Sequence, residues 1–412
     1  RDNFDYLKIF KKLTGVHFMD CTFYSYSLSI ENVEFFFDSC EFENAWYISN
    51  HKLLTNNHNI LYQQCTFNEN VSSSSESDKE YYEFSEKLFS DCTFKSEVSF
   101  SKIIFKAPIF KNTGYEVFKI ESLKISDSII EERLILNNYE IREINFKNTV
   151  FNDKVELKDN SILKAYLHDS NFIGLADFFN STFQVFEAHK CIFSEFTGFE
   201  NCEFGTNDDS FSKNNCVFNY VTFLDFINFR NTNFYSGLDI SNINYSIPPN
   251  FLNSEIEISK TNRETFRIVK DSFDKNGNYI EGNKYYVNEM KKLKEESIEN
   301  NNLSNRFLLF IYHITSNYGQ SYIRPTVFMI MMSLIYWLVI IGFENNFLYE
   351  IMPSMNGYIF SISNFINGIA SHIMPFARIL KEGMEFISLI FYILFSTSIW
   401  LFILAVKRNT KR

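Results

Sequence analysis

The chain has 412 residues, enough for two or three structural regions, and 48 of them are Phe. Aromatic residues make up 18% of the chain, more than an ordinary globular core needs, so the excess predicts a fold that stacks aromatic rings in a regular way. The formal net charge of −11 is divided unevenly, with −15 on residues 1–300 and +4 on residues 301–412, and an acidic first part disfavours nonspecific binding to nucleic acid or anionic lipid there.

A triplet, Cys-x-Phe, recurs along the first part of the chain and contains all seven cysteines. The pairs are Cys21 and Phe23, Cys40 and Phe42, Cys65 and Phe67, Cys92 and Phe94, Cys191 and Phe193, Cys202 and Phe204, and Cys216 and Phe218. A residue type confined to one position of a repeat serves packing, so we expect free thiols that behave as small hydrophobic groups. The odd number and the absence of C-x-x-C pairs disfavour disulfides and zinc sites, and fit a reducing compartment.

Around the triplets, a large apolar residue recurs about every five positions, as at Phe218, Phe223, Phe229 and Phe234, although some intervals are six residues long. This spacing fits neither an α-helix nor an alternating β-strand. It is typical of a coil with a square cross-section, in which each side contributes one inward Phe and one inward small residue. Successive coils would stack about 4.8 Å apart through backbone hydrogen bonds.

The triplets and this spacing resemble the pentapeptide-repeat family over roughly residues 20–250. The resemblance implies a mainly β fold, a right-handed parallel β-helix with the Cys and Phe positions listed above in its core. We expect residues 1–19 to form an N-terminal cap or leader and residues 20–253 to form the solenoid. The polar run within 68–90 predicts an exposed loop, and 111–145 reads partly as ordinary strands rich in Ile and Leu.

After Ser254 the apolar spacing becomes helical, first at Phe266, Val269 and Phe273 and then from Tyr279 through Glu299. Turn residues separate the two segments, so we predict a helical hairpin over 254–300 that caps the last coil. This region also looks like the segment that follows the repeats in a group of bacterial pentapeptide-repeat membrane proteins. That similarity implies a bacterial source and a membrane location.

Two segments without charge, 326–343 and 386–406, measure about 27 and 32 Å as helices, enough to cross a bilayer of about 30 Å. We therefore predict a two-helix transmembrane domain over 325–412, preceded by an interfacial segment at 301–324 that lies flat on the membrane. The basic residues that flank the two spans predict that both chain ends face the cytoplasm. The expected location is the inner membrane of a bacterium.

Between the spans, 364–380 is too short and polar to cross a bilayer and too apolar for a free loop. It predicts either an amphipathic helix on the outer leaflet or a pore-type helix that dips into the membrane. In the second case the candidate residues of the pore or its outer mouth are Glu344, Glu350, His372, Glu382 and Glu385.

The sequence contains no nucleophile elbow, no P-loop and no metal-binding spacing, so we expect neither enzymatic activity nor a cofactor. We predict a membrane-anchored cytoplasmic scaffold that binds an unidentified protein partner and forms a homo-oligomer in the lipid bilayer. The alternative is an oligomeric ion channel or membrane-perturbing effector gated by the repeat domain. DNA mimicry, which is known for some acidic members of the family, conflicts with membrane attachment.

Overall fold

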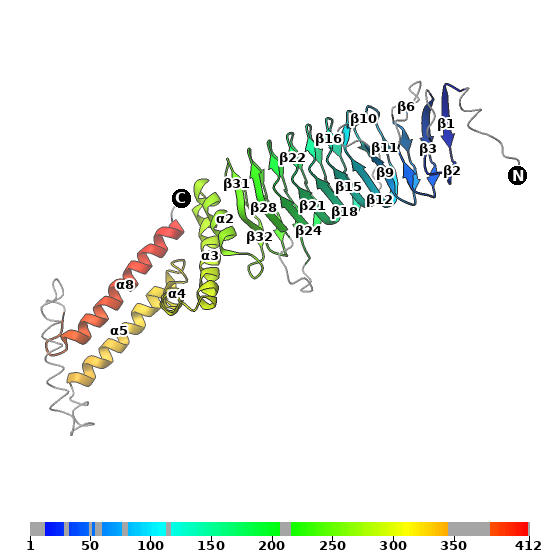
Figure 1. Ribbon diagram of the computed structural model, residues 1–412. Coiled ribbons are helices and arrows are strands. Elements are labelled where there is room, and N and C mark those ends of the chain that lie inside the picture. Colours follow the sequence, from blue (N-terminus) through cyan, green and yellow to red (C-terminus); the bar gives the residue numbers. More distant parts are fainter. Residues whose placement is uncertain are drawn as a thin grey trace. The chain divides into compact units, whose positions relative to one another are not determined.

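The computed structural model describes residues 13–28, 33–48, 52–53, 60–75, 81–112, 117–206, 216–344 and 380–410. The chain divides into two compact units, Arg1–Asn276 and Gly277–Arg412. The first unit is a parallel β-solenoid of about ten turns, and the second unit is helical (Figure 1). The solenoid fold with a helical C-terminal region that we predicted from the sequence is therefore confirmed.

The described strands form three parallel sheets along the sides of the solenoid. The first sheet contains β1 (Gly15–Met19), β3 (Glu34–Asp38), β6 (Lys52–Leu53), β7 (Tyr62–Gln63), β11 (Phe89–Ser90) and β14 (Phe110–Lys111). The third contains β17 (Leu134–Ile135), β20 (Val155–Glu156), β23 (Ala176–Asp177), β26 (Thr197–Gly198) and β29 (Ile227–Asn228).

The second sheet is the largest and contains the long strands of the solenoid. These are β12 (Thr93–Ser101), β15 (Phe118–Ser126), β18 (Tyr139–Lys147), β21 (Ser161–His168), β24 (Thr182–His189), β28 (Cys216–Phe223) and β31 (Asp239–Tyr245). Its short strands are β2 (Thr22–Phe23), β4 (Glu41–Phe42), β5 (Trp46–Tyr47), β8 (Thr66–Phe67), β9 (Val71–Ser74), β10 (Tyr82–Phe84), β13 (Ile103–Phe105), β16 (Ile129–Ile130), β19 (Val150–Phe151), β22 (Asn171–Phe172), β25 (Ile192–Phe193), β27 (Glu203–Phe204), β30 (Asn233–Phe234) and β32 (Glu255–Ile256).

One turn of the regular part takes 21 residues, since Phe151 pairs in register with Phe172 and Phe172 with Phe193. One series of buried residues along such a turn is Phe172, Phe178, Phe183, Ala188 and Phe193, spaced by five except for one step of six. The four-sided coil expected from the five-residue spacing is therefore lengthened by one residue on one side. That extra residue accounts for the six-residue intervals in the sequence.

Two corners of the turn are held by residues in the left-handed conformation. One corner contains Asp159, Asn180 and Asn201, with φ values of 56°, 54° and 58°. Asn and Asp adopt this conformation more readily than other residues with a side chain. The corner side chains also bond from turn to turn, and Asn180 Nδ2 donates to Asp159 Oδ1 at 2.7 Å. These corners precede the inward small residues and explain why an acidic, amide or other polar residue often stands before Cys.

The inward Phe side chains stack in columns along the solenoid axis. In one column the ring centroids of Phe151, Phe172, Phe193 and Phe223 are separated by 4.7, 4.5 and 5.1 Å, with interplanar angles of 6°, 7° and 14°. Each of the four side chains is 1% exposed. Burying a Phe side chain contributes about 1.5–3 kcal/mol, so the columns dominate the stability of this unit.

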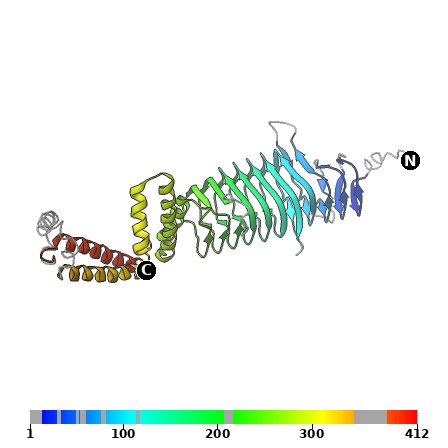
Figure 2. The same cartoon turned by 90° about the horizontal axis from the view of Figure 1, so that it is seen from below.

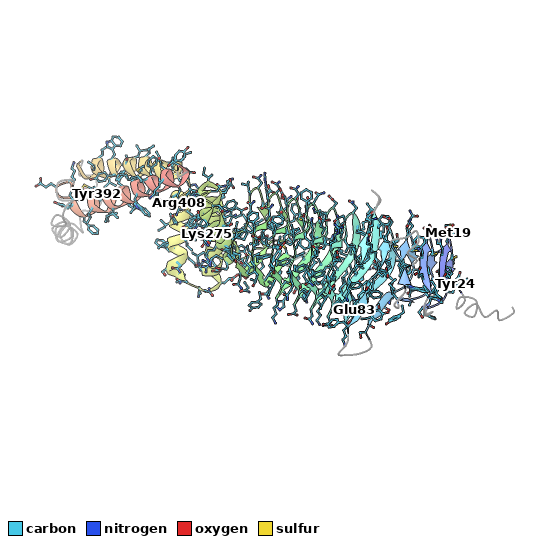
Figure 3. The ribbon with its side chains drawn as sticks, turned by 90° about the horizontal axis from the view of Figure 1, so that it is seen from above. Met19, Tyr24, Glu83, Lys275, Tyr392 and Arg408 are labelled. Carbon is cyan, nitrogen blue, oxygen red and sulfur yellow. The ribbon has the colours of Figure 1, made fainter. Side chains whose placement is uncertain are left out.

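The core residues proposed from the repeat lie as follows. The side chains of Phe42, Phe67, Phe94, Phe193, Phe204, Phe218, Phe223, Phe229 and Phe234 are at most 1% exposed. Phe23 and Cys21 belong to the first coil and are partly exposed, and the exposed Met19 and Tyr24 lie at the same end (Figure 3). Cys40, Cys65, Cys92, Cys191, Cys202 and Cys216 are buried free thiols.

Three stretches differ from the sequence-based expectation. Within 117–145 the coils continue regularly, because Ile120, Ile130 and Leu134 fill inward positions at 1% exposure or less. The polar run within 68–90 is not all loop, since β9 places Ser73 in the core beside Phe100 of the next turn. Within 1–19, β1 pairs with β3 in the first coil, and residues 1–12 of the predicted cap or leader lie outside the described residues.

The buried thiols donate hydrogen bonds to the backbone of the preceding turn. Cys191 Sγ lies 3.1 Å from Leu167 O, and Cys202 Sγ lies 3.0 Å from Phe178 O. Burial raises the pKa of the Cys191 thiol to about 11 and that of the Cys202 thiol to about 12. Both thiols therefore remain protonated at neutral pH.

We expect alkylation of the folded protein near pH 8 to be fastest at Cys21. A rise in pKa from 9.0 to about 11 lowers the thiolate fraction of Cys191 about 100-fold, and burial slows its reaction further. Cys21 has its pKa raised by burial as well, yet its side chain is partly exposed. Peptide mapping after timed iodoacetamide treatment measures the rates, with urea-unfolded protein as the control. Equal rates at Cys21 and Cys202 in the folded protein would contradict this packing.

Helix α2 (Arg263–Lys275) covers the last coil of the solenoid within the first unit. The hydroxyl oxygens of Thr261 and Thr265 accept hydrogen bonds from the backbone N–H groups of Leu238 and Ile240, each at 3.1 Å. Ser272 Oγ donates to a backbone oxygen of the same end, at Pro249. The helix thus supplies partners for backbone groups that another strand would otherwise pair.

The second unit contains α3 (Tyr279–Glu299), α4 (Leu303–Ser316), α5 (Ile323–Glu344) and α8 (Glu385–Thr410). The hairpin predicted over 254–300 is therefore divided, because α2 belongs to the solenoid unit and α3 to the helical unit. Helices α5 and α8 lie side by side in opposite directions (Figure 1). By length and composition these two helices, over Ile323–Gly342 and Glu385–Thr410, can span a membrane, and their most apolar 18-residue windows have mean hydropathies of 2.0 and 2.4.

Candidate interaction face and membrane unit

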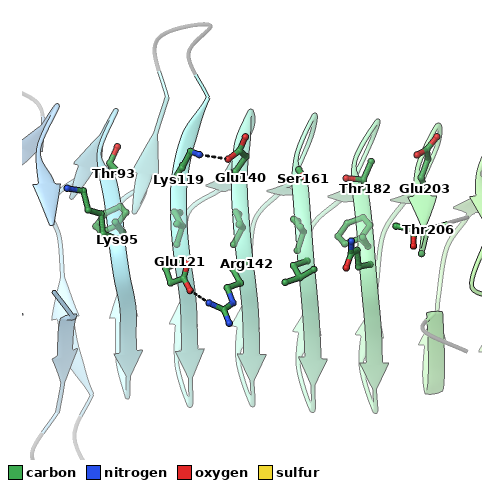
Figure 4. A pocket seen from close by; sticks show the side chains of 18 residues that line it. Thr93, Lys95, Lys119, Glu121, Glu140, Arg142, Ser161, Thr182, Glu203 and Thr206 are labelled. Carbon is green, nitrogen blue, oxygen red and sulfur yellow. Dashed lines mark hydrogen bonds and ion pairs between the residues drawn. The ribbon is translucent and has the colours of Figure 1, made fainter. Parts of the chain in front are cut away.

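One side of the solenoid carries an open groove of roughly 800 Å³ over β12, β15, β18, β21, β24 and β27 (Figure 4). In-register pairing aligns outward side chains of successive turns in two rows. The first row is Thr93, Lys119, Glu140, Ser161, Thr182 and Glu203, and the second is Lys95, Glu121, Arg142, Leu163, Gln184 and Gly205. Side chains at equivalent positions of successive turns therefore follow one another along the groove at the spacing of parallel strands, about 4.8 Å.

Ion pairs cross from turn to turn in the groove. Lys119 Nζ lies 2.8 Å from Glu140 Oε2, and Arg142 Nη1 lies 2.5 Å from Glu121 Oε1 (Figure 4). All four side chains are 44–68% exposed, and exposed pairs of this kind contribute about 0–1 kcal/mol to stability. Their charges are accessible to a partner. The open shape and the exposed charges suit contact with a protein surface better than enclosure of a small molecule.

In the helical unit, α5 and α8 touch along a narrow seam. Tyr336 Oη and Ser388 Oγ are hydrogen-bonded at 2.9 Å, and the rings of Tyr336 and Phe391 are 4.8 Å apart. On α8 the small side chains of Ser388, Ser398 and Ala405 are buried, at 4%, 3% and 0% exposure. Outside this seam the apolar surface is uncovered, since 6% of the most apolar part of α5 and 22% of that of α8 is buried.

The residues predicted for a pore are only partly described. Glu350 and His372 lie outside the described residues, as does nearly all of 364–380. Glu344 is the last residue of α5, and Glu382 is exposed just before α8. Glu385 Oε1 accepts a hydrogen bond from the backbone N–H of Gly383 at 3.1 Å, in the first turn of α8. The structure places Glu382 and Glu385 at the start of α8, and the pore remains a hypothesis.

A joint at the opposite end of α8 was missed by the sequence analysis. Arg408, near the end of α8 (Figure 3), donates a hydrogen bond from Nη1 to Tyr318 O at 2.6 Å. Its guanidinium lies 4.5 Å from the ring centroid of Tyr286. Asn283 Nδ2 of α3 donates to Arg408 O at 3.0 Å. Arg408 therefore connects α8 with α3 and with the turn between α4 and α5. In the sequence it reads as one of several basic residues that flank a span.

We expect Gly319→Ala to destabilise this joint more than Gly277→Ala. Both glycines have a left-handed φ, of 77° and 76°, so either substitution costs about 1 kcal/mol for backbone strain. A Cβ at position 319 would also lie 2.8 Å from Tyr312 Oη and 3.0 Å from Arg408 Nη1, whereas nothing lies within 4 Å at 277. The extra cost is about 1–3 kcal/mol. Thermal unfolding in detergent measures it, and equal losses in the two variants would contradict the packing.

Among the described residues, no group of three or more His, Cys, Asp or Glu side chains is arranged to hold a metal ion. Comparison of the chain with protein-family models, with curated proteins and with solved structures finds no match. The interpretation of function therefore rests on the grooved face of the solenoid and on the exposed apolar helices.

Proposed function

We propose that this protein is a membrane-anchored, non-enzymatic scaffold of the pentapeptide-repeat type. The proposal rests on the exposure of α5 and α8, since most of the apolar surface of both helices is uncovered. Soluble proteins rarely expose apolar patches larger than a few hundred Å², because contact of such surface with water is unfavourable. In a bilayer the same surface meets lipid tails, and the helices satisfy their own backbone hydrogen bonds.

The orientation of the anchor follows from its flanking charges. Arg324 lies in the first turn of α5, and Lys407 and Arg408 lie in the last turn of α8. Basic residues at the ends of spans favour the cytoplasmic side, so both chain ends would lie in the cytoplasm. The resemblance of the segment after the repeats to bacterial pentapeptide-repeat membrane proteins supports an inner-membrane location. The 21-residue turn with its five-residue spacing supports the family assignment.

The solenoid would supply the binding face of the scaffold. Its groove presents two rows of residues, most of them charged or hydrogen-bonding, on a sheet held by in-register pairing. A protein partner with the complementary pattern of charges would be steered to this face. Because two helices cover each other only along a seam, we also propose that copies of the chain associate in the membrane as a homo-oligomer.

Reconstitution of the full chain into liposomes tests the scaffold against the channel alternative. The scaffold predicts protein that resists alkaline extraction and ion flux no greater than that of protein-free liposomes. Flux that is lost on substitution of Glu382 or Glu385 would overturn the scaffold in favour of an oligomeric channel or membrane-perturbing effector.

Charge reversal tests the role of the groove in cells that make the protein. The variant Lys119→Glu with Arg142→Glu reverses two groove cations, and Lys147→Glu with Arg230→Glu reverses two exposed cations outside the groove. We expect crosslinking in intact cells to lose its protein adducts in the groove variant and to keep them in the control. Equal loss in the two variants would show that net charge, rather than this face, matters.

A further inference from the structure

Helix α4 turns an apolar stripe away from the helix it packs on. The stripe consists of Leu303, Phe307, Phe310, Ile311 and Ile314, which are 71%, 67%, 50%, 43% and 51% exposed. Their spacing of three and four residues places them on one side of the helix. The other side carries the buried Leu309 and Ser316, at 5% and 0% exposure, and this side contacts the rest of the unit. A water-facing helix has the opposite arrangement.

The position of α4 in its unit matches a membrane surface. The helix precedes α5 and lies across the end of the α5 and α8 pair rather than along it (α4 is yellow in Figure 2). When α5 and α8 cross a bilayer, a helix so placed lies in the plane of the interface, with an apolar stripe available to the boundary between headgroups and acyl chains.

Three cations lie beside the same helix. Lys294 Nζ of α3 is 5.9 Å from the ring centroid of Phe310, and Arg324 Nη1 donates to His313 O at 2.9 Å. Desolvation, followed by the charges of Arg324, Lys294 and Lys291, lowers the pKa of His313, so these three cations act on one site. On α3, Lys284 pairs with Glu281 at 2.6 Å and Lys292 with Glu295 at 2.9 Å.

We propose that the apolar stripe of α4, together with Lys291, Lys294 and Arg324, binds the surface of an anionic bilayer. The stripe enters the interface, and the three cations contact lipid phosphates. An anionic bilayer is the partner that fits this surface, because apolar side chains and cations lie together next to two spanning helices. Acyl chains complement the apolar stripe, and lipid phosphates complement the cations. This inference rests on the proposed function, because it requires α5 and α8 to cross the same bilayer.

Photocrosslinking of the full chain tests this contact. The photoreactive residue p-benzoylphenylalanine replaces Phe307 in the stripe or, as a control, Tyr220, which is 59% exposed on the solenoid. The protein is reconstituted in phosphatidylcholine mixed with phosphatidylglycerol. We expect lipid adducts from position 307 and none from 220, with phosphatidylglycerol enriched among the adducts by up to about fivefold for each cation involved.

A pair of double variants isolates the charges. Lys291→Gln with Lys294→Gln should keep the lipid adduct and lose most of the phosphatidylglycerol enrichment, whereas Lys291→Arg with Lys294→Arg should keep both. Adducts to protein in place of lipid would overturn the inference, and so would lipid adducts of the unaltered chain without phosphatidylglycerol enrichment. In either case resistance to alkaline extraction would still support the membrane anchor. Release of the unaltered chain by alkali would instead overturn the proposed function itself.

Discussion

We expect replacement of Phe193 by Asp to unfold the solenoid, and replacement of its neighbour Ile192 by Asp to leave it folded. Phe193 is 1% exposed, and its ring lies between those of Phe172 and Phe223, at 4.5 and 5.1 Å. Loss of the aromatic packing costs about 3–5 kcal/mol, and burial of a carboxyl group without a partner adds several more. The sum is comparable to the whole stability of a typical domain, about 5–15 kcal/mol.

Ile192 is the matched control, because it lies on the same strand, β25, and is 40% exposed. Asp at this position points outward and disturbs no column. Far-ultraviolet circular dichroism and urea unfolding of the two variants measure the difference. If Ile192→Asp unfolds the protein and Phe193→Asp does not, the inward and outward sides of the coil are reversed.

Arg408→Ala has the second largest expected effect, on the helical unit. The substitution removes the hydrogen bond to Tyr318 O and the contact with the Tyr286 ring. A hydrogen bond from a charged group contributes about 1.5–3 kcal/mol, and a cation–π contact about 0.5–1 kcal/mol. We therefore expect a loss of about 2–4 kcal/mol.

Thermal unfolding of the full chain in detergent measures this loss, followed through a reporter in the helical unit. Lys407→Ala removes the adjacent exposed cation and should have little effect. Arg408→Lys keeps the charge but lacks the planar fork, so it should recover only part of the stability. Equal unfolding temperatures for Arg408→Ala and Lys407→Ala would show that the joint does not hold the unit together.

The solenoid could be predicted because each of its turns must fill the same cross-section. That constraint repeats Phe at inward positions and Cys, Ser, Thr or Ala two residues earlier, which the seven Cys-x-Phe triplets make visible. The pattern is hidden where Ile120 and Ile130 fill the same positions, because aliphatic residues also occur in ordinary strands. Burial selects for size and apolarity, so either residue type satisfies the core.

The groove and the joint depend on contacts between residues distant in sequence. In the sequence Lys119 and Glu140 look like ordinary surface charges. Their contact can be predicted only when the turn length of 21 residues is known. Arg408 bonds to the backbone oxygen of Tyr318, and a backbone acceptor leaves no trace in residue identity. The apolar residues of α4 were visible in the sequence, but the side that they face is fixed by packing of Leu309 and Ser316.

We propose that α5 and α8 anchor the solenoid in a membrane. Alkaline carbonate extraction of membranes from cells that make the full chain, followed by flotation of the pellet in a density gradient, tests it most directly. We expect the protein to float with the lipid, because two uncovered apolar helices remain in the bilayer when alkali removes peripheral proteins. Release of the folded protein into the alkaline supernatant would contradict it.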